Sequence, residues 1–517
     1  MGILLSKRLS TNGLSIHIDE KGIIFQSYDS YKLHTIDPIR ALFLSFLHYL
    51  SGGRDISTDL IEIAFKCVIA FFGGNPEIYK LKDKILNTTL KKLVRIGKYP
   101  RFIAHVASPE KIISGLYNVI DENAYEISLR TLAIDKLNSL LGLVIIPTFK
   151  CHLRCLYCYQ KTSKINKPIF PERLNGLMKF NIFKKVIDEA RDLGLTTVVF
   201  TGGEPFLHPR IFDMLKYTYK NDIYTEVSTK FPLKEKDVKK LEGNVDKIQI
   251  SLDCHIPEIQ DKLTQVKGSG EWLLKDIELL SKTNIRLQVN VVVTTYNINY
   301  IPDLIEYLYY KGVDVITLSI YGLSITNPNQ ELRPSRDDYI NLAHKIEEKL
   351  ANFPDTVEDI DYGYISLGDK TILVVSPIYA IRDIFHKKKE DSLLRLGMFN
   401  CGAYRSGLAI LPDGDVLGCD RMYSLPWYKK LVVGNVKKQS IKEIWYSEKT
   451  YQLAKPSRDK FKDTMCFNCE LFDYCLSFGF CYLDAYYTSG KMYGPRLNCP
   501  RSENYDTLFK KLFGVNC

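Results

Sequence analysis

The chain has 517 residues, a length that suggests about three domains. Hydrophobic residues make up 45% and charged residues 25%, which excludes a disordered or collagen-like protein. The net charge of +10 is spread along the chain, and no apolar window approaches the ~20 residues that a membrane span needs. Because the N-terminus shows no signal peptide, we expect a soluble, cytoplasmic protein with neither a membrane nor a nucleic acid as partner.

Cysteine is distributed very unevenly. Of the 13 cysteines, eight follow residue 400. In a reducing compartment, cysteines at short spacings are more often metal ligands than disulfide partners. Each cysteine group is therefore a candidate metal site.

Residues 1–105 have the pattern of a small winged-helix-like unit. Alternating residues at Leu14–Ile18 and at Ile23–Ser27, separated by a polar turn, predict a β-hairpin. Asp37 and Pro38 mark the start of an apolar helix, and a second capped helix and a basic helix follow before residue 100. We expect residues 106–140 to form a helical linker.

In residues 141–330, predicted strands alternate with amphipathic helices, which is typical of a parallel sheet. The six predicted strands are Leu143–Pro147, Thr196–Thr201, Ile223–Ser228, Lys247–Leu252, Leu287–Thr294 and Val315–Ile320. Six βα units predict an α/β fold built on a partial (β/α)6 barrel, with functional groups at the carboxyl ends of the strands. Residues 331–395 form a bridging region without an assigned motif, and residues 396–517 form a C-terminal domain.

Three cysteines follow the first predicted strand directly. Cys151, Cys155 and Cys158 have the spacing C-x3-C-x2-C. A closed zinc site needs four ligands, so zinc would have to recruit a fourth residue, for which His152 is available. A 4Fe-4S cluster on three thiolates instead leaves one iron open, and that iron can bind the amine and carboxylate of a small molecule.

A second motif follows the second predicted strand. Gly202, Gly203, Glu204 and Pro205 lie about 40 residues after the cysteine triplet. By themselves they predict a strand-to-helix turn, with Glu204 as a first-turn acid. Together with the triplet they resemble the radical S-adenosylmethionine (radical SAM) superfamily.

The resemblance implies a 4Fe-4S cluster at Cys151, Cys155 and Cys158, and a set of S-adenosylmethionine contacts. These contacts would be Tyr157, Gly202, Gly203, Glu204, Ser228, Thr229, Ser251 and Val292. Three departures from the family pattern stand out: Lys230 replaces the usual Asn, Cys254 the usual Gly, and Lys262 and Thr264 lie where many relatives place an Arg for the cofactor carboxylate.

The C-terminal cysteines resemble the SPASM extension of radical SAM enzymes, which binds two auxiliary 4Fe-4S clusters. The resemblance implies one cluster on Cys401, Cys419 and Cys481, and another on Cys466, Cys469, Cys475 and Cys499. Five residues separate Cys475 from Cys481, where the family has three, so the place of Cys481 is the least secure. Zinc ribbons are the alternative, since C-x2-C pairs also suit zinc.

The N-terminal pattern is similar to the peptide-recognition elements of ribosomal peptide maturation systems, which bind a leader peptide as an added strand. The resemblance therefore implies a radical SAM/SPASM oxidoreductase that modifies or crosslinks (by a thioether or carbon-carbon bond) residues of a ribosomally made precursor peptide with a leader. Flavodoxin or ferredoxin would be its reducing partner, and three 4Fe-4S clusters and S-adenosylmethionine its cofactors. The alternatives are a formylglycine-forming side-chain maturase of the anaerobic sulfatase-maturing type and a non-enzymatic iron-sulfur or zinc protein.

No residue is identified as the catalytic base. Asp253, Cys254 and Tyr321 follow strand ends and face the expected cavity, so they are the candidates. Each of them is equally consistent with packing or turn formation.

Overall fold

The computed structural model describes 140–159, 176–321, 329–374 and 401–499, with gaps at 356, 362–363, 369–370, 471, 478 and 497–498, and the backbone of three N-terminal strands. The predicted helices of residues 37–100 and the linker 106–140 lie outside the described residues. The winged-helix prediction is therefore described only through its strands.

The N-terminal strands form an antiparallel sheet in the order β1-β2-β3. Strands β1 (Leu14–Asp19) and β2 (Gly22–Ser27) are the predicted hairpin, with Ile16 opposite Phe25. Strand β3 (Lys32–Ile36) was not predicted, because its five residues show little alternation of apolar and polar side chains. It pairs with β2 and ends directly before Asp37.

The second sheet has 12 strands in the order β10-β11-β12-β9-β8-β7-β6-β5-β4-β13-β14-β15. Its central six strands are β4 (Gly142–Ile145), β5 (Thr197–Phe200), β6 (Tyr224–Thr229), β7 (Lys247–Ser251), β8 (Arg286–Val293) and β9 (Val315–Ile320). All neighbours among these six are parallel. The six-stranded parallel prediction is confirmed, with ends that differ by no more than two residues.

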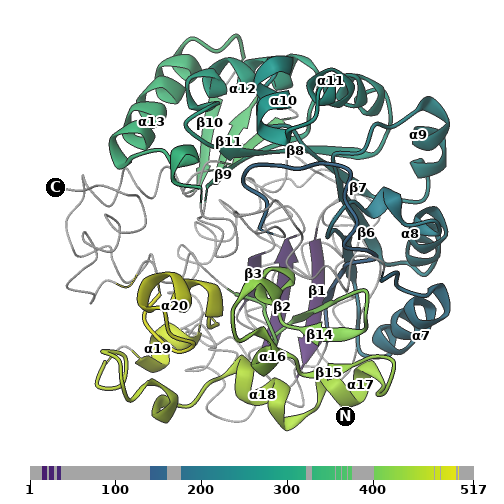
Figure 1. Cartoon of the computed structure of the whole chain (residues 1–517), viewed down its shortest axis with the longest axis vertical. Coiled ribbons are helices and arrows are strands. Elements are labelled where there is room, and N and C mark those ends of the chain that lie inside the picture. The colour runs from purple at the N-terminus through teal and green to yellow at the C-terminus, as the bar shows by residue number, and fades with distance from the viewer. Residues whose placement is uncertain are drawn as a thin grey trace, which may run out of the picture. The chain divides into compact units, whose positions relative to one another are not determined.

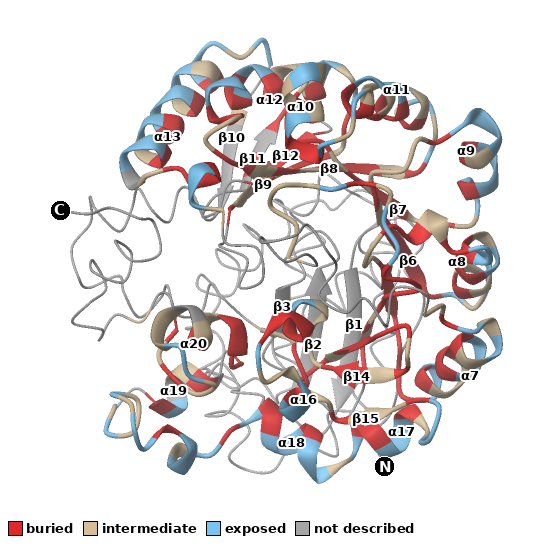
Figure 2. Cartoon of the chain, viewed as in Figure 1, coloured by how far each residue is buried: buried red, intermediate tan, exposed pale blue. Residues whose placement is uncertain are grey.

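Helices between these strands lie along one side of the sheet (Figure 1). They are α7 (Phe180–Arg191), α8 (Ile211–Lys220), α9 (Glu235–Leu241), α10 (Pro257–Thr264), α11 (Ser269–Leu280), α12 (Ile301–Tyr310) and α13 (Arg336–Ala351). Their buried residues face the sheet and their exposed residues face outward (Figure 2); the buried residues include Met214 and Leu215 in α8, Leu273 and Ile277 in α11, and Leu304 and Ile305 in α12. Among the described helices, none has the length and apolar character that crossing a membrane requires.

Segments outside the six units extend the sheet at both edges. The bridging region adds β12 (Thr371–Val374) parallel to β9, then β11 (Tyr364–Leu367) and β10 (Val357–Asp361). The C-terminal domain adds β13 (Gly407–Ile410) parallel to β4, then β14 (Asp415–Leu417) and β15 (Gly434–Asn435). The sequence did not predict these additions because they depend on pairings between distant strands, which leave no local pattern: Ile372 lies opposite Val315, 57 residues away, and Gly407 opposite Gly142, 265 residues away.

Short helices complete the C-terminal domain. They are α16 (Tyr428–Leu431), α17 (Ile441–Trp445), α18 (Glu448–Ala454), α19 (Phe472–Ser477) and α20 (Tyr482–Ser489). Trp445 and Tyr482 are among its fully buried side chains.

Candidate functional site

The loop that carries Cys151, Cys155 and Cys158 leaves the carboxyl end of β4 and is held by main-chain hydrogen bonds on two sides. These bonds run from Gly203 N to Thr148 O (3.1 Å), Glu204 N to Lys150 O (2.7 Å), Arg154 N to Thr264 O (3.0 Å) and Leu156 N to Leu263 O (2.9 Å). The cysteine loop is therefore fixed between the turn after β5 and the end of α10.

The two glycines of that turn are required by this packing. A Cβ on Gly203 would lie 2.2 Å from Lys150 O, and a Cβ on Gly202 would lie 2.4 Å from a side-chain carbon of Ile146. Gly202 also has a φ of +126°, which side chains rarely adopt. These glycines let the turn approach the cysteine loop, a role that the sequence resemblance did not include.

The thiols of the loop influence one another. Desolvation of the thiol by the surrounding loop, together with the neighbouring Cys155, raises the pKa of Cys151 to about 12, although the residue as a whole is exposed. Thiolates in this position need a compensating positive group, which the iron core of a cluster provides. His152, the candidate fourth zinc ligand, packs its ring against Phe231 and Trp272, with centroids 5.7 and 6.0 Å away. The three thiols of the loop therefore remain the predicted donor set, and His152 lies among aromatic rings.

Glu204 is buried at the carboxyl end of the strands, with 2% of its surface exposed. Its Oε1 accepts hydrogen bonds from Thr229 Oγ1 (2.7 Å) and Phe206 N (3.1 Å), and its Oε2 accepts one from Lys230 N (3.0 Å). Burial raises the pKa of Glu204 to about 7, although these hydrogen bonds oppose the rise. Glu204 thus caps the short helix Pro205–Leu207, and three hydrogen bonds fix the position of its carboxyl group.

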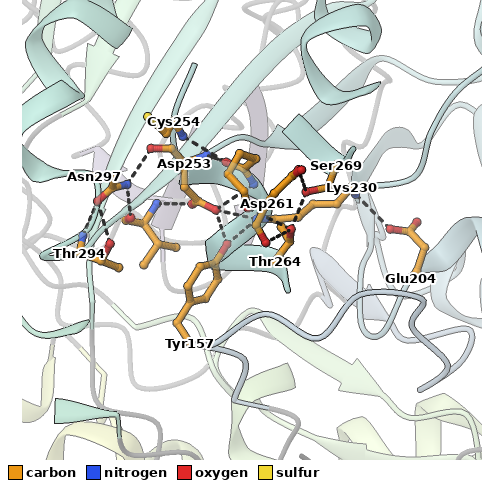
Figure 3. A network of polar contacts seen from close by, with 12 residues as sticks. Tyr157, Glu204, Lys230, Asp253, Cys254, Asp261, Thr264, Ser269, Thr294 and Asn297 are labelled. Atoms are coloured by element: carbon orange, nitrogen blue, oxygen red, sulfur yellow. Dashed lines mark hydrogen bonds and ion pairs between the residues drawn. The ribbon is translucent and has the colours of Figure 1, made fainter. Parts of the chain in front are cut away.

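Lys230, Asp253 and Tyr157 form one polar network (Figure 3). Lys230 Nζ lies 2.7 Å from Asp253 Oδ2, and the Tyr157 hydroxyl contacts both groups. Asp253 Oδ1 accepts a hydrogen bond from Val292 N at 2.9 Å. Burial lowers the pKa of Lys230, but Asp253 and the thiols of Cys155 and Cys151 raise it by more. The pKa is therefore raised overall, and Lys230 is a largely buried cation.

The other predicted cofactor contacts lie around this network. Ser228 and Ser251 are half-buried near or at the ends of β6 and β7, and Thr229 is directed to Glu204. Val292 and Tyr157 pack against a cluster formed by Leu263, Tyr321 and Leu332. The structure thus places these residues at the same end of neighbouring strands.

The three catalytic candidates differ in their surroundings. Cys254 is fully buried, and burial raises the pKa of its thiol to about 11. Tyr321 is 2% exposed, and its hydroxyl accepts a hydrogen bond from Asn329 N at 3.2 Å. Both environments favour a packing role, whereas Asp253 belongs to the polar network.

Two polar residues that the sequence analysis did not single out hold Asp253 in place. Gln260 Oε1 accepts hydrogen bonds from the backbone of Asp253 (2.8 Å) and Cys254 (3.1 Å). Asn297 Nδ2 donates to Asp253 O (2.7 Å) and to Val292 O (2.9 Å). Both are buried amides just inside or before a helix, and nothing in the sequence distinguishes them from surface amides.

The C-terminal cysteines interact in two sets. A hydrogen bond with Cys481 lowers the pKa of Cys401 to about 6, helped by Arg496 and Arg405, and Cys401 also interacts with Cys419. Burial raises the pKa of Cys466 to about 12, with further contributions from Cys499, Cys475 and Cys469. Each of these interactions joins cysteines within one of the two predicted sets, but none of them tests the sets as cluster ligands. Among the described residues, no group of three or more Cys, His, Asp or Glu side chains has the arrangement to hold a metal ion, so the ligand sets stay predictions.

Two family models match the chain: the radical SAM superfamily over residues 145–308, and the iron-sulfur cluster-binding domain SPASM over residues 401–470. The chain is 22% identical over 317 residues to a PqqA peptide cyclase of Granulibacter bethesdensis, covering 60% of this chain and 75% of that protein. It is 26% identical over 345 residues to AlbA, an antilisterial bacteriocin subtilosin biosynthesis protein of Bacillus subtilis, covering 65% and 66%.

Among solved structures, Streptococcus suis SuiB bound to the precursor peptide SuiA has a similar fold. The TM-score is 0.58 at 17% identity, and the alignment covers 95% of this chain and 99% of that one. The two family models, the clamped cysteine loop and the shared fold lead to one conclusion. The chain contains a region that matches the radical SAM superfamily, residues 145–308, followed by a region that matches the SPASM iron-sulfur cluster-binding domain, residues 401–470.

Proposed function

We propose that this protein is a radical SAM/SPASM peptide maturase that forms a thioether or carbon-carbon crosslink in a ribosomally made precursor peptide. The observation that carries the proposal is the cysteine loop clamped against Gly203 and Glu204 at the carboxyl ends of the barrel strands. Two further cysteine sets in the C-terminal domain support an oxidative outcome, because auxiliary clusters can accept an electron from the substrate.

Cys151, Cys155 and Cys158 would hold the catalytic cluster, and Glu204 would bind the amino group of S-adenosylmethionine. When bound, the reduced cluster and S-adenosylmethionine supply a 5'-deoxyadenosyl radical that removes hydrogen from an unactivated carbon. The protein's part is to bind, orient and exclude water. Glu204 is suited to this part because three hydrogen bonds fix its carboxylate before any ligand arrives.

A peptide substrate is supported by the relatives. The names of the PqqA peptide cyclase and of the subtilosin biosynthesis protein describe proteins that act on peptides or in making one. A precursor peptide with a leader, a reducing partner such as flavodoxin or ferredoxin, and a cytoplasmic location complete the proposal. The location follows from the clusters, because cytosolic thiols stay reduced.

The cofactor half of the proposal is tested by replacing all three of Cys151, Cys155 and Cys158 with Ala. We expect anaerobically purified, dithionite-reduced wild type to form 5'-deoxyadenosine and the variant to form none. Iron should fall from about twelve to about eight per chain, since each 4Fe-4S cluster holds four irons. Undiminished 5'-deoxyadenosine in the variant would contradict the assignment.

The peptide half is tested by searching the neighbouring open reading frames for a short precursor and incubating that peptide with the enzyme. A crosslink removes two hydrogen atoms from the peptide, whereas formation of formylglycine from cysteine removes the sulfur. Mass spectrometry of the treated peptide separates the two reactions. Unchanged peptide, with 5'-deoxyadenosine still formed, would reject that peptide as the substrate.

A further inference from the structure

The cofactor carboxylate has no arginine partner at the expected place in this chain. Lys262 and Thr264 lie there instead, at the end of α10. Lys262 Nζ lies 3.8 Å from the centroid of the Tyr296 ring. The Thr264 hydroxyl is buried and interacts with Gln260 O at 3.0 Å and Ser269 Oγ at 2.5 Å. Both side chains are therefore engaged elsewhere.

A different cation occupies the centre of the site. Lys230 directly follows β6, and its side chain runs from the neighbourhood of Glu204 to Asp253 and Tyr157 (Figure 3). Its backbone N–H donates to Glu204 Oε2 at 3.0 Å, and its ammonium lies 2.7 Å from Asp253 Oδ2. One residue thus links the carboxylate for the cofactor amine to the buried Asp253.

The Lys230 ammonium has a hydrogen-bond donor that a ligand could use. Of its three N–H donors, two are engaged by side chains of the described residues, Asp253 and Tyr157. The Lys230 side chain is 11% exposed, whereas that of Asp253 is fully buried. The third donor and this partial exposure are therefore available to a ligand.

Asp253 and Tyr157 hold the ammonium in position. Asp253 is anchored by Val292 N through Oδ1 and by Asn297 and Gln260 through its backbone. Tyr157 belongs to the cysteine loop itself, and Lys230 Nζ also lies 5.1 Å from the centroid of its ring. A lysine fixed on two sides loses little side-chain freedom when it binds an anion, which favours affinity.

The amine and the carboxylate of a methionine group share one carbon, so their two partners must both lie within reach of that carbon. The Lys230 backbone N–H donates to Glu204, and the Lys230 side chain carries its ammonium from there to Asp253, so the two partners are separated by about the length of one lysine side chain. We propose that Lys230 binds the carboxylate of S-adenosylmethionine, and that Asp253 and Tyr157 position it for this contact. The inference rests on the proposed function only in that the protein binds S-adenosylmethionine.

The test is cofactor binding by the anaerobic holoenzyme, measured by equilibrium dialysis with S-adenosylmethionine and with decarboxylated S-adenosylmethionine. A charged hydrogen bond contributes roughly 10- to 100-fold in affinity. We expect wild type to prefer the carboxylated form by about that factor, and Lys230→Met to lose this preference while binding the decarboxylated form as wild type does. Lys230→Arg should retain most of the preference.

Lys262→Met is the matched control, because it removes the lysine nearest to the usual arginine position. It should bind both ligands as wild type does. Loss of the preference in Lys262→Met rather than in Lys230→Met would overturn the proposal, as would equal binding of both ligands by wild type. Equal weakening of both ligands by Lys230→Met, at wild-type iron content, would make Lys230 merely structural.

Lys230→Met leaves Asp253 buried without its cation, so Lys230→Met combined with Asp253→Asn provides a folded, neutral alternative. It should also lose the preference, and retention of the preference by this double variant would overturn the proposal. Absence of any S-adenosylmethionine binding by wild type would contradict the proposed function itself. A failure of Lys230 alone leaves wild-type binding intact, so the two failures are distinguishable.

Discussion

Strands β6 and β7 are joined by a lysine-carboxylate pair toward each of their ends. Toward the amino ends, Lys247 Nζ lies 2.8 Å from Glu226 Oε2, and both side chains are buried. Beyond the carboxyl ends, Lys230 Nζ lies 2.7 Å from Asp253 Oδ2. The charges and distances match, yet the surroundings differ.

The pair toward the amino ends is enclosed by protein, and both of its side chains are buried. Lys247 also donates to Gln288 at 3.0 Å, and Gln288 donates to Thr317 at 3.0 Å, so polar groups continue across β8 to β9. The carboxyl-end pair instead includes Tyr157 from the cysteine loop and keeps partial exposure. The same kind of ion pair is therefore enclosed within the sheet at one end of the barrel and lies beside the proposed cofactor site at the other.

The largest effect is expected from Lys247→Met. It leaves the Glu226 carboxylate buried without its cation, which costs about 3–5 kcal/mol of unfolding free energy. Urea unfolding measures the loss. Combining it with Glu226→Gln should recover most of the stability, and an unchanged urea midpoint in Lys247→Met would contradict a structural role for this pair.

Glu204→Gln should have the next largest effect on the unfolding free energy. Unlike Lys247→Met, it should make the protein less sensitive to a rise in pH. A folded pKa of about 7 lies above the ordinary value of 4.5, so the stability contributed by the Glu204 carboxyl is full below pH 4.5 and is lost as the pH rises through about 7. The variant lacks this loss, and between pH 5 and pH 8 wild type should lose about 2 kcal/mol more than the variant does. Urea unfolding at both pH values, without S-adenosylmethionine, checks this.

The same variant should bind S-adenosylmethionine more weakly, because a neutral amide replaces the carboxylate that faces the ammonium group. Unchanged affinity for S-adenosylmethionine would contradict a binding role for Glu204.

In the unfolding test, the same dependence of unfolding free energy on pH in wild type and variant would show that the Glu204 pKa is not raised.

Gly203→Ala and Gly142→Ala test how much room the backbone leaves for a Cβ atom at the two ends of the barrel. The Cβ on Gly203 would meet Lys150 O at 2.2 Å, whereas a Cβ on Gly142 meets nothing within 4 Å. Overpacking of this kind costs about 1–3 kcal/mol, and it should displace the cysteine loop. We expect Gly203→Ala to lose iron from the catalytic cluster, measured by iron analysis, and Gly142→Ala to keep it; equal iron contents would contradict the clamp.

Tyr157→Phe should have the smallest effect. It removes one hydroxyl from the Lys230–Asp253 pair but keeps the ring that packs beside Leu263 and Tyr321. A net hydrogen bond contributes about 1 kcal/mol, so S-adenosylmethionine affinity should fall less than tenfold. A larger loss would mean that Tyr157, rather than Lys230, provides the main polar contact.

The sequence by itself determined the order of the six barrel strands, the cysteine groups and the Gly202–Glu204 turn. These features are readable because each depends on neighbours within a few residues: strands on apolar runs, the turn on adjacent glycines, and the cysteine loop on its short spacing. The sequence also marked Lys230 as a departure, although it did not say what that lysine contacts.

Only the tertiary structure decided what meets at the carboxyl ends of the strands. Lys230 lies 73 residues after Tyr157 in the chain, and Asp253 lies 96 residues after it. Gln260 and Asn297 contact Asp253 from two other segments. The outer strands β12 and β13 are likewise set by pairing with distant edges. Such contacts depend on how a parallel sheet brings separate strand ends together, and no local residue pattern records that choice.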